Sequence, residues 1–173
     1  MDFGEAVALL AQCADKFILR HEVSHHILGH TETGGRPLSY IEDLPAHCKY
    51  WKKLAPASHQ QEYEADASAL AMTLQAPCPD IEVKRQREFE TAIGALLTLT
   101  VIGQLVGDVD DVTPSHPSVS SRFDQCLEIL RVICKHNVNN VKGTIFLIKR
   151  FQTLLWITQR KGLGRRWEGM EQI

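Results

Sequence analysis

Length, composition and charge limit what this chain can be. Its 173 residues are 44% hydrophobic and 23% charged, which is enough to bury a core without cross-links. The formal net charge of −2 gives no electrostatic reason to expect a nucleic-acid partner. Five cysteines without a CxxC pair fit reduced thiols in a cytoplasmic protein, and an acidic start without a basic region argues against a secretory signal. We expect one domain over residues 1–173, with a basic tail from about residue 161.

The first predicted element is a long amphipathic helix from about Gly4 to Leu28. Apolar residues recur at steps of three and four between Ala6 and Ile18 and lead directly into the sequence HEVSH at residues 21–25. Gly29 follows the last periodic residue and is predicted to end the helix.

The HExxH pattern inside this helix predicts a hydrolytic zinc site. Spacing of four residues puts the rings of His21 and His25 about 40° apart around the axis and about 6 Å along it, so both can reach one ion. Glu22 lies on the flank of that face, where its carboxylate can hold a water.

Two alternatives to this interpretation depend on neighbouring residues. The chain has eight histidines, so the pentapeptide could be a chance polar stripe on a surface helix. A metzincin site would need a glycine and a third histidine where this chain has Leu28 and Thr31, so that class is excluded.

A second helix is predicted to open with EYEAD at residues 62–66 and to stop before Pro77. A catalytic zinc ion takes three protein ligands, and Glu62 is suited to be the third. Asp66, one turn further on, can accept the far N–H of a ligating imidazole. Helical geometry predicts that Glu64 points away into solvent. The glycine- and proline-rich segment before this helix predicts loops, a short helix around Cys48 to Leu54, and a lid over the site.

Three further helices are predicted: Val83 to Val106, Ser118 to Cys134, and Lys142 to Arg160. The apolar half of the first, from Ala92, is interrupted by polar residues and is shorter than the roughly 20 residues of a membrane span. A buried central helix is therefore expected, and membrane association is not. The predicted fold class is mainly α.

Three blocks in this order resemble the gluzincin zinc metallopeptidases, most closely the M48 family. The blocks are HEVSHHILGH at residues 21–30, EYEAD at 62–66 and SHPSVSSR at 115–122, and they span about the first three quarters of the chain. His30 adds to the resemblance, because many soluble M48-like peptidases carry a histidine there. The stretch FILRHEVSHHILGH is also similar to the Lit-type peptidases of phage exclusion. The resemblance implies a compact helical zincin-like domain, a minimal gluzincin, with the metal site between two packed helices.

The same resemblance implies roles for individual residues. It makes His21, His25 and Glu62 the zinc ligands, Glu22 the general base, and Asp66 the group that orients a ligand. In gluzincins a strand normally precedes the active-site helix and pairs with substrate, whereas the twenty residues before His21 are predicted to be helical.

The third block adds two candidates near the reaction centre, His116 and Arg122. Both could donate to the oxyanion of a tetrahedral intermediate, which needs a donor besides zinc. Arg122 could instead form a structural salt bridge with Asp66. His116, held between Pro114 and Pro117, could instead be a latent-state zinc ligand or an ordinary loop histidine.

The functional prediction is a zinc-dependent metalloendopeptidase that acts on protein or peptide substrates. The alternative is a catalytically silent helical regulatory or interaction module that retains a zinc site. Glu22 favours the enzyme, because a purely structural zinc site has no use for a general base.

Overall fold

The computed structural model of the chain describes residues 2–30, 55–106 and 112–134. Within these ranges it has four helices and no strand: α1 (Phe3–Ile27), α3 (Ala57–Leu74), α4 (Ile81–Val106) and α5 (Val119–Ile133). The predicted mainly α fold is thereby confirmed. The predicted helices at 48–54 and 142–160, the basic tail and most of the predicted lid lie outside the described residues. The single domain over 1–173 stays a prediction.

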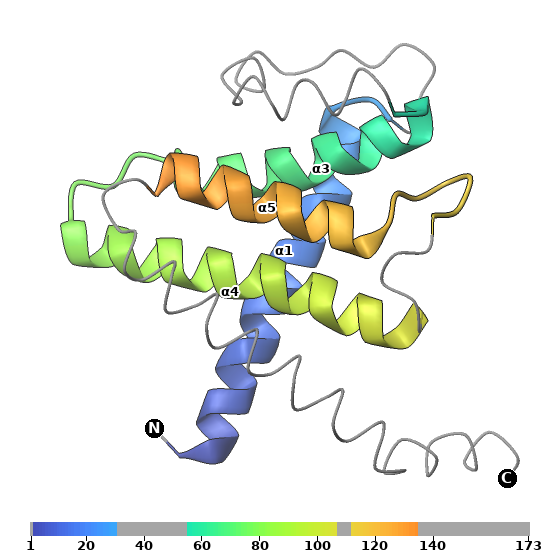
Figure 1. Cartoon of the computed structure of the whole chain (residues 1–173). Coiled ribbons are helices and arrows are strands. Elements are labelled where there is room, and N and C mark those ends of the chain that lie inside the picture. The colour runs from blue at the N-terminus through green and yellow to red at the C-terminus, as the bar shows by residue number, and fades with distance from the viewer. Residues whose placement is uncertain (1, 31–54, 107–111, 135–173) are drawn as a thin grey trace, which may run out of the picture.

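The helices α3, α4 and α5 lie side by side, and α1 crosses behind them at a steep angle (Figure 1). α1 packs against α3 and α4, and α5 packs against the same two helices. The second half of α1, which carries the HEVSH sequence, therefore lies against α3, which carries EYEAD.

Both ends of α1 are fixed by local hydrogen bonds. At the start, the Asp2 side chain accepts from the Glu5 N–H while the Glu5 carboxylate accepts from the Asp2 N–H, which is a capping box. At the end, Gly29 has a φ of 69°, and the His30 N–H donates to the carbonyl of His25. This is the Schellman arrangement, and Gly29 ends the helix as predicted. The turn folds His30 back over the last turn of α1.

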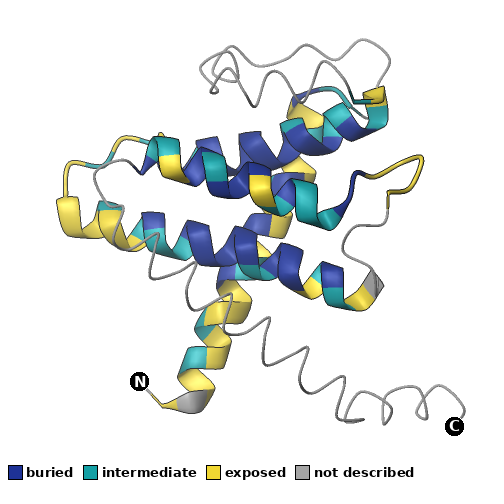
Figure 2. Cartoon of the chain, in the orientation of Figure 1, coloured by how far each residue is buried: buried dark blue, intermediate teal, exposed yellow. Residues whose placement is uncertain are grey.

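The core lies where the four helices meet (Figure 2). Its largest fully buried apolar side chains come from α4, α5, α3 and the end of α1: Leu96, Leu99, Ile129, Leu130, Leu70 and Leu28. The prediction of a buried central helix is confirmed for α4, whose residues 92–96 are all buried. None of the described helices combines the length and the apolar content that a membrane span requires.

The crossing of α1 and α4 depends on a glycine. A Cβ atom added at Gly94 would lie 2.2 Å from the backbone oxygen of Cys13, so only glycine fits at this contact. Alanines 65, 67, 69 and 71 are likewise buried on α3. These small residues let the helices approach closely enough for α1 and α3 to share one site.

The start of α3 differs from the prediction. The helix begins at Ala57, five residues before Glu62, because Pro56 has the φ of −54° that suits a helix start and residues 57–60 contain no helix breaker. His59, which the sequence assigned to a loop, is therefore helical and buried, and its Nε2 lies 2.8 Å from the carbonyl oxygen of Thr113. The helix ends at Leu74, before Pro77 as predicted.

Candidate metal centre

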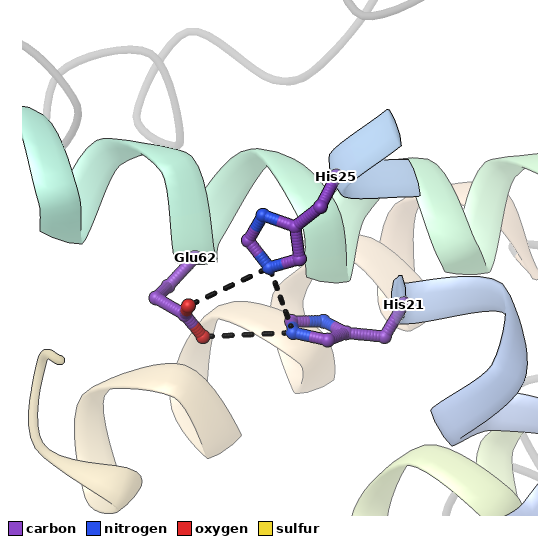
Figure 3. Close-up of side chains that lie close together, drawn as sticks. All are labelled: His21, His25 and Glu62. Carbon is purple, nitrogen blue, oxygen red and sulfur yellow. Dashed lines mark hydrogen bonds and ion pairs between the residues drawn. The ribbon is translucent and has the colours of Figure 1, made fainter. Parts of the chain in front are cut away.

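Three side chains from two helices point toward one another beside the α1 and α3 contact (Figure 3). The Nε2 atoms of His21 and His25 lie 3.1 Å apart. Each of them lies 3.5 Å from one carboxylate oxygen of Glu62: Oε2 faces His21 and Oε1 faces His25. The three donor atoms all lie within 4.8 Å of one another.

These distances fit the ligand set of a catalytic zinc site. With metal–ligand bonds of about 2.0 to 2.1 Å, two ligands of a tetrahedral ion are separated by about 3.3 Å. The observed separations of 3.1 and 3.5 Å lie on either side of that value. Two imidazole nitrogens at 3.1 Å also repel each other through their lone pairs unless a positive charge lies between them. The donor set, two imidazoles and one carboxylate, is one that zinc uses for hydrolysis.

Asp66 lies behind His21, on the side away from the other two donors. Its Oδ1 is 2.9 Å from Nδ1 of His21, although the ring N–H is not aimed squarely at this oxygen, so the contact is a close ion pair rather than a well-directed hydrogen bond. Burial lowers the pKa of His21, but the carboxylates of Asp66 and Glu62 outweigh burial and raise it to about 9. Burial and the neighbouring His21 together lower the pKa of His25. The centre therefore favours a positive charge at His21 Nε2.

Arg122, from α5, binds the two acidic residues of α3 at once. Its Nε and Nη2 donate to the two oxygens of Asp66 at 2.8 Å each, and its Nη1 lies 2.9 Å from Oε2 of Glu62. Burial raises the pKa of Asp66, but Arg122 outweighs burial and lowers it to about 2. The salt bridge that the structural alternative for Arg122 requires is thus present. All three guanidinium nitrogens face carboxylates.

His25 has a different neighbour on its far side. Its Nδ1 lies 3.0 Å from Nδ1 of His30, and Nε2 of His30 lies 3.0 Å from Oε2 of Glu64. The expectation that Glu64 points into solvent is wrong, because the turn at Gly29 brings His30 over α3, where Glu64 meets it. His26, by contrast, is exposed.

A cavity of about 510 Å³ opens beside the three donors. Glu22 is exposed and lines this cavity together with His116, whose Nε2 lies 3.8 Å from Oε1 of Glu62. Nδ1 of His116 is 2.8 Å from Oγ of Ser115. The remaining walls are mainly apolar and come from α1, α4 and α5: Phe17, Ile18, Ile102, Pro117 and Val119.

The sequence gave no role to two residues that hold the loop of His116. Ser58 and His59, in the first turn of α3, reach the carbonyl oxygens of Pro114 and Thr113 at 2.9 and 2.8 Å. The only signal for them was helical continuity back to Pro56, which the prediction overlooked. The structure thus brings all seven predicted site residues to one region, and adds His30 and Glu64 to it.

The described part of the chain is thus a helical protein with a candidate His–His–Glu metal centre open to a cavity. A family model, Peptidase U49, matches residues 3–141, a stretch that includes all four described helices. The chain therefore belongs to the Peptidase U49 family. Neither the curated proteins nor the solved structures contain a match to it. Family membership points to peptidase activity, with protein or peptide as the substrate class.

Proposed function

We propose that this protein is a zinc-dependent endopeptidase of the HExxH gluzincin type, with an M48-like arrangement of its three sequence blocks. One observation carries the proposal: the donor atoms of His21, His25 and Glu62 converge within 4.8 Å, and Glu22 lines the adjoining cavity. Membership of a peptidase family supports hydrolysis of a peptide bond as the reaction.

In this proposal His21, His25 and Glu62 hold the ion. Zinc, when bound, polarises the water and the scissile carbonyl. Glu22 accepts a proton from the attacking water and then returns it to the nitrogen of the leaving amine, as a general base and then a general acid. Glu22 is free to carry out both transfers because its side chain is exposed at the cavity rather than buried in an ion pair.

His116 and Arg122 act differently in the proposal. Nε2 of His116 is on the cavity side, close to Glu62, and donates to the oxyanion as the carbonyl carbon becomes tetrahedral. Arg122 positions Glu62 and Asp66, because its guanidinium is engaged by their carboxylates. Asp66 in turn orients His21.

The substrate chain is proposed to lie in the cavity between α1, α4 and α5, where apolar walls adjoin the donors. We also propose a cytoplasmic location. It is supported by free thiols at four cysteines in the described ranges, Cys13, Cys78, Cys126 and Cys134.

The test is the Glu22→Gln variant, which keeps size and hydrogen bonding but removes the base. Zinc content should stay at about one ion per chain, while hydrolysis of an unfolded protein substrate should fall by at least about a hundredfold. Glu82→Gln on the exposed start of α4 is the matched control and should retain full activity. Hydrolysis by Glu22→Gln at the wild-type rate would contradict the mechanism. Full zinc content in a His21→Ala, His25→Ala double variant would contradict the site.

A further inference from the structure

The two histidines of the candidate centre are supported in unequal ways. His21 lies directly against a carboxylate, with Nδ1 2.9 Å from the fully buried Asp66. His25 lies on the last turn of α1, and its Nδ1 faces the ring of His30 instead. A ligating histidine keeps its orientation and tautomer when its other ring nitrogen has a fixed partner.

We propose that His30 and Glu64 form a relay that positions His25 for metal binding. The proposal rests on the metal centre of the proposed function. It assigns roles to two residues outside the ligand set, one of them a glutamate that the sequence placed in solvent.

The relay follows from counting protons on the ring nitrogens. A metal ligand at Nε2 of His25 must carry its proton on Nδ1, so this N–H donates to Nδ1 of His30 at 3.0 Å. Nδ1 of His30 then has to be the unprotonated nitrogen, and the proton of His30 is on Nε2. That N–H donates to Oε2 of Glu64, also at 3.0 Å. Each donor faces one acceptor, and the tautomer of each ring is determined.

The backbone explains why His30 is in the right place. The His30 N–H donates to the carbonyl of His25 at 2.9 Å, and the Gly29 N–H donates to the carbonyl of His26 at 3.0 Å. These two hydrogen bonds and the positive φ of Gly29 hold the chain in a Schellman turn. The turn packs the rings of His25 and His30 edge to face, with centroids 5.1 Å apart.

Burial sets the expected size of the effect. The side chain of His30 is 8% exposed and that of Glu64 is 22% exposed, whereas that of Asp66 is fully buried. Water can therefore replace Glu64 more readily than it can replace His30. We expect His30→Ala to weaken zinc binding by about ten- to a hundredfold, and Glu64→Ala to weaken it less.

The experiment measures zinc affinity by competition with a chromophoric chelator, with folding of each metal-free variant checked by circular dichroism. His30→Asn places an amide oxygen near the position of Nδ1, and Glu64→Gln keeps an acceptor oxygen for His30. Both should recover most of the affinity that the alanine variants lose, which a general loss of packing would not produce. His26→Ala, an exposed histidine next to His25, is the matched control and should bind zinc as the wild type does.

A second readout follows the proton itself. In the zinc-loaded protein, nitrogen-15 spectra should show the Nδ1 proton of His25 protected from exchange with water, and His30→Ala should remove this protection. If His30→Ala does not fold, the Glu64→Ala and Glu64→Gln pair carries the test.

The outcomes separate the relay from the proposed function. Wild-type zinc affinity in both His30→Ala and Glu64→Ala would overturn the relay, as would an equal loss in His26→Ala. A wild type that binds zinc but hydrolyses no peptide would overturn the proposed function while the relay stands on the affinity data. A wild type that binds no zinc would overturn both.

Discussion

Arg122 and Asp66 form a bidentate ion pair in the interior, with Nε and Nη2 of the arginine each 2.8 Å from a carboxylate oxygen. Asp66 is fully buried and Arg122 is 7% exposed. The pair joins α5 to α3 directly beneath the candidate metal centre. Removing one partner would leave the other charge buried and unpaired in this contact, which is more damaging than replacing both.

Acid should weaken the fold through this pair. Because the pKa of Asp66 is lowered to about 2 in the folded chain, its contribution to stability is complete above the pKa of the unfolded chain and is lost as the pH falls through the folded value. The loss between about pH 5 and pH 2 should be on the order of 2 kcal/mol of unfolding free energy. Urea denaturation across this range, with a chelator present, measures it. A double variant, Asp66→Asn with Arg122→Met, should show a smaller dependence, and an unchanged one would contradict this expectation.

Zinc affinity should rank the acidic residues of α3. Glu62→Ala removes a proposed ligand and should nearly abolish binding, whereas Asp66→Ala should weaken binding by about ten- to a hundredfold, because Asp66 acts through His21. Metal titration of refolded, chelator-treated protein measures both. Equal losses in the two variants would show that Asp66 does not act through His21.

His116→Ala should lower turnover by about a hundredfold at unchanged zinc content if Nε2 donates to the oxyanion. The Michaelis constant should change little, because the interaction forms only in the transition state. Ser115→Ala, which removes the hydrogen bond to Nδ1, should give a smaller loss in the same direction. Increased turnover would instead support a latent-state ligand, and unchanged turnover would reduce His116 to a loop residue.

Gly94→Ala should destabilise the fold. The added Cβ would meet the backbone of Cys13, which cannot rotate away, and overpacking of this kind costs roughly 1 to 3 kcal/mol or more. For a chain of this length, each kcal/mol corresponds to a drop of about 2 to 4 °C in melting temperature. The control is Gly4→Ala, where the nearest atom is the flexible side chain of Asp2 at 3.3 Å, and it should change stability by less than about 1 kcal/mol. Equal melting temperatures for the two variants would contradict this account of the helix crossing.

The sequence by itself determined the helices and the two histidines that face one ion. The spacing of four residues between His21 and His25 fixes their relation through local backbone geometry alone. Apolar periodicity and helix-ending residues likewise place α1, α4 and α5 to within two residues at their ends. These features depend on residues close together in the chain, so no knowledge of the packing is needed.

Only the tertiary structure decided what stands behind the three donors. That Arg122 engages both Glu62 and Asp66 depends on how α5 lies on α3, 56 positions of sequence away from Asp66. That Glu64 meets His30 depends on a turn at Gly29 and on the crossing of α1 over α3, neither of which helical periodicity encodes. The close approach of these helices requires small residues at their contacts, and its geometry is set by packing over the whole core. The surroundings of a metal ligand therefore follow from the packing of helices, even where the ligands themselves follow from spacing.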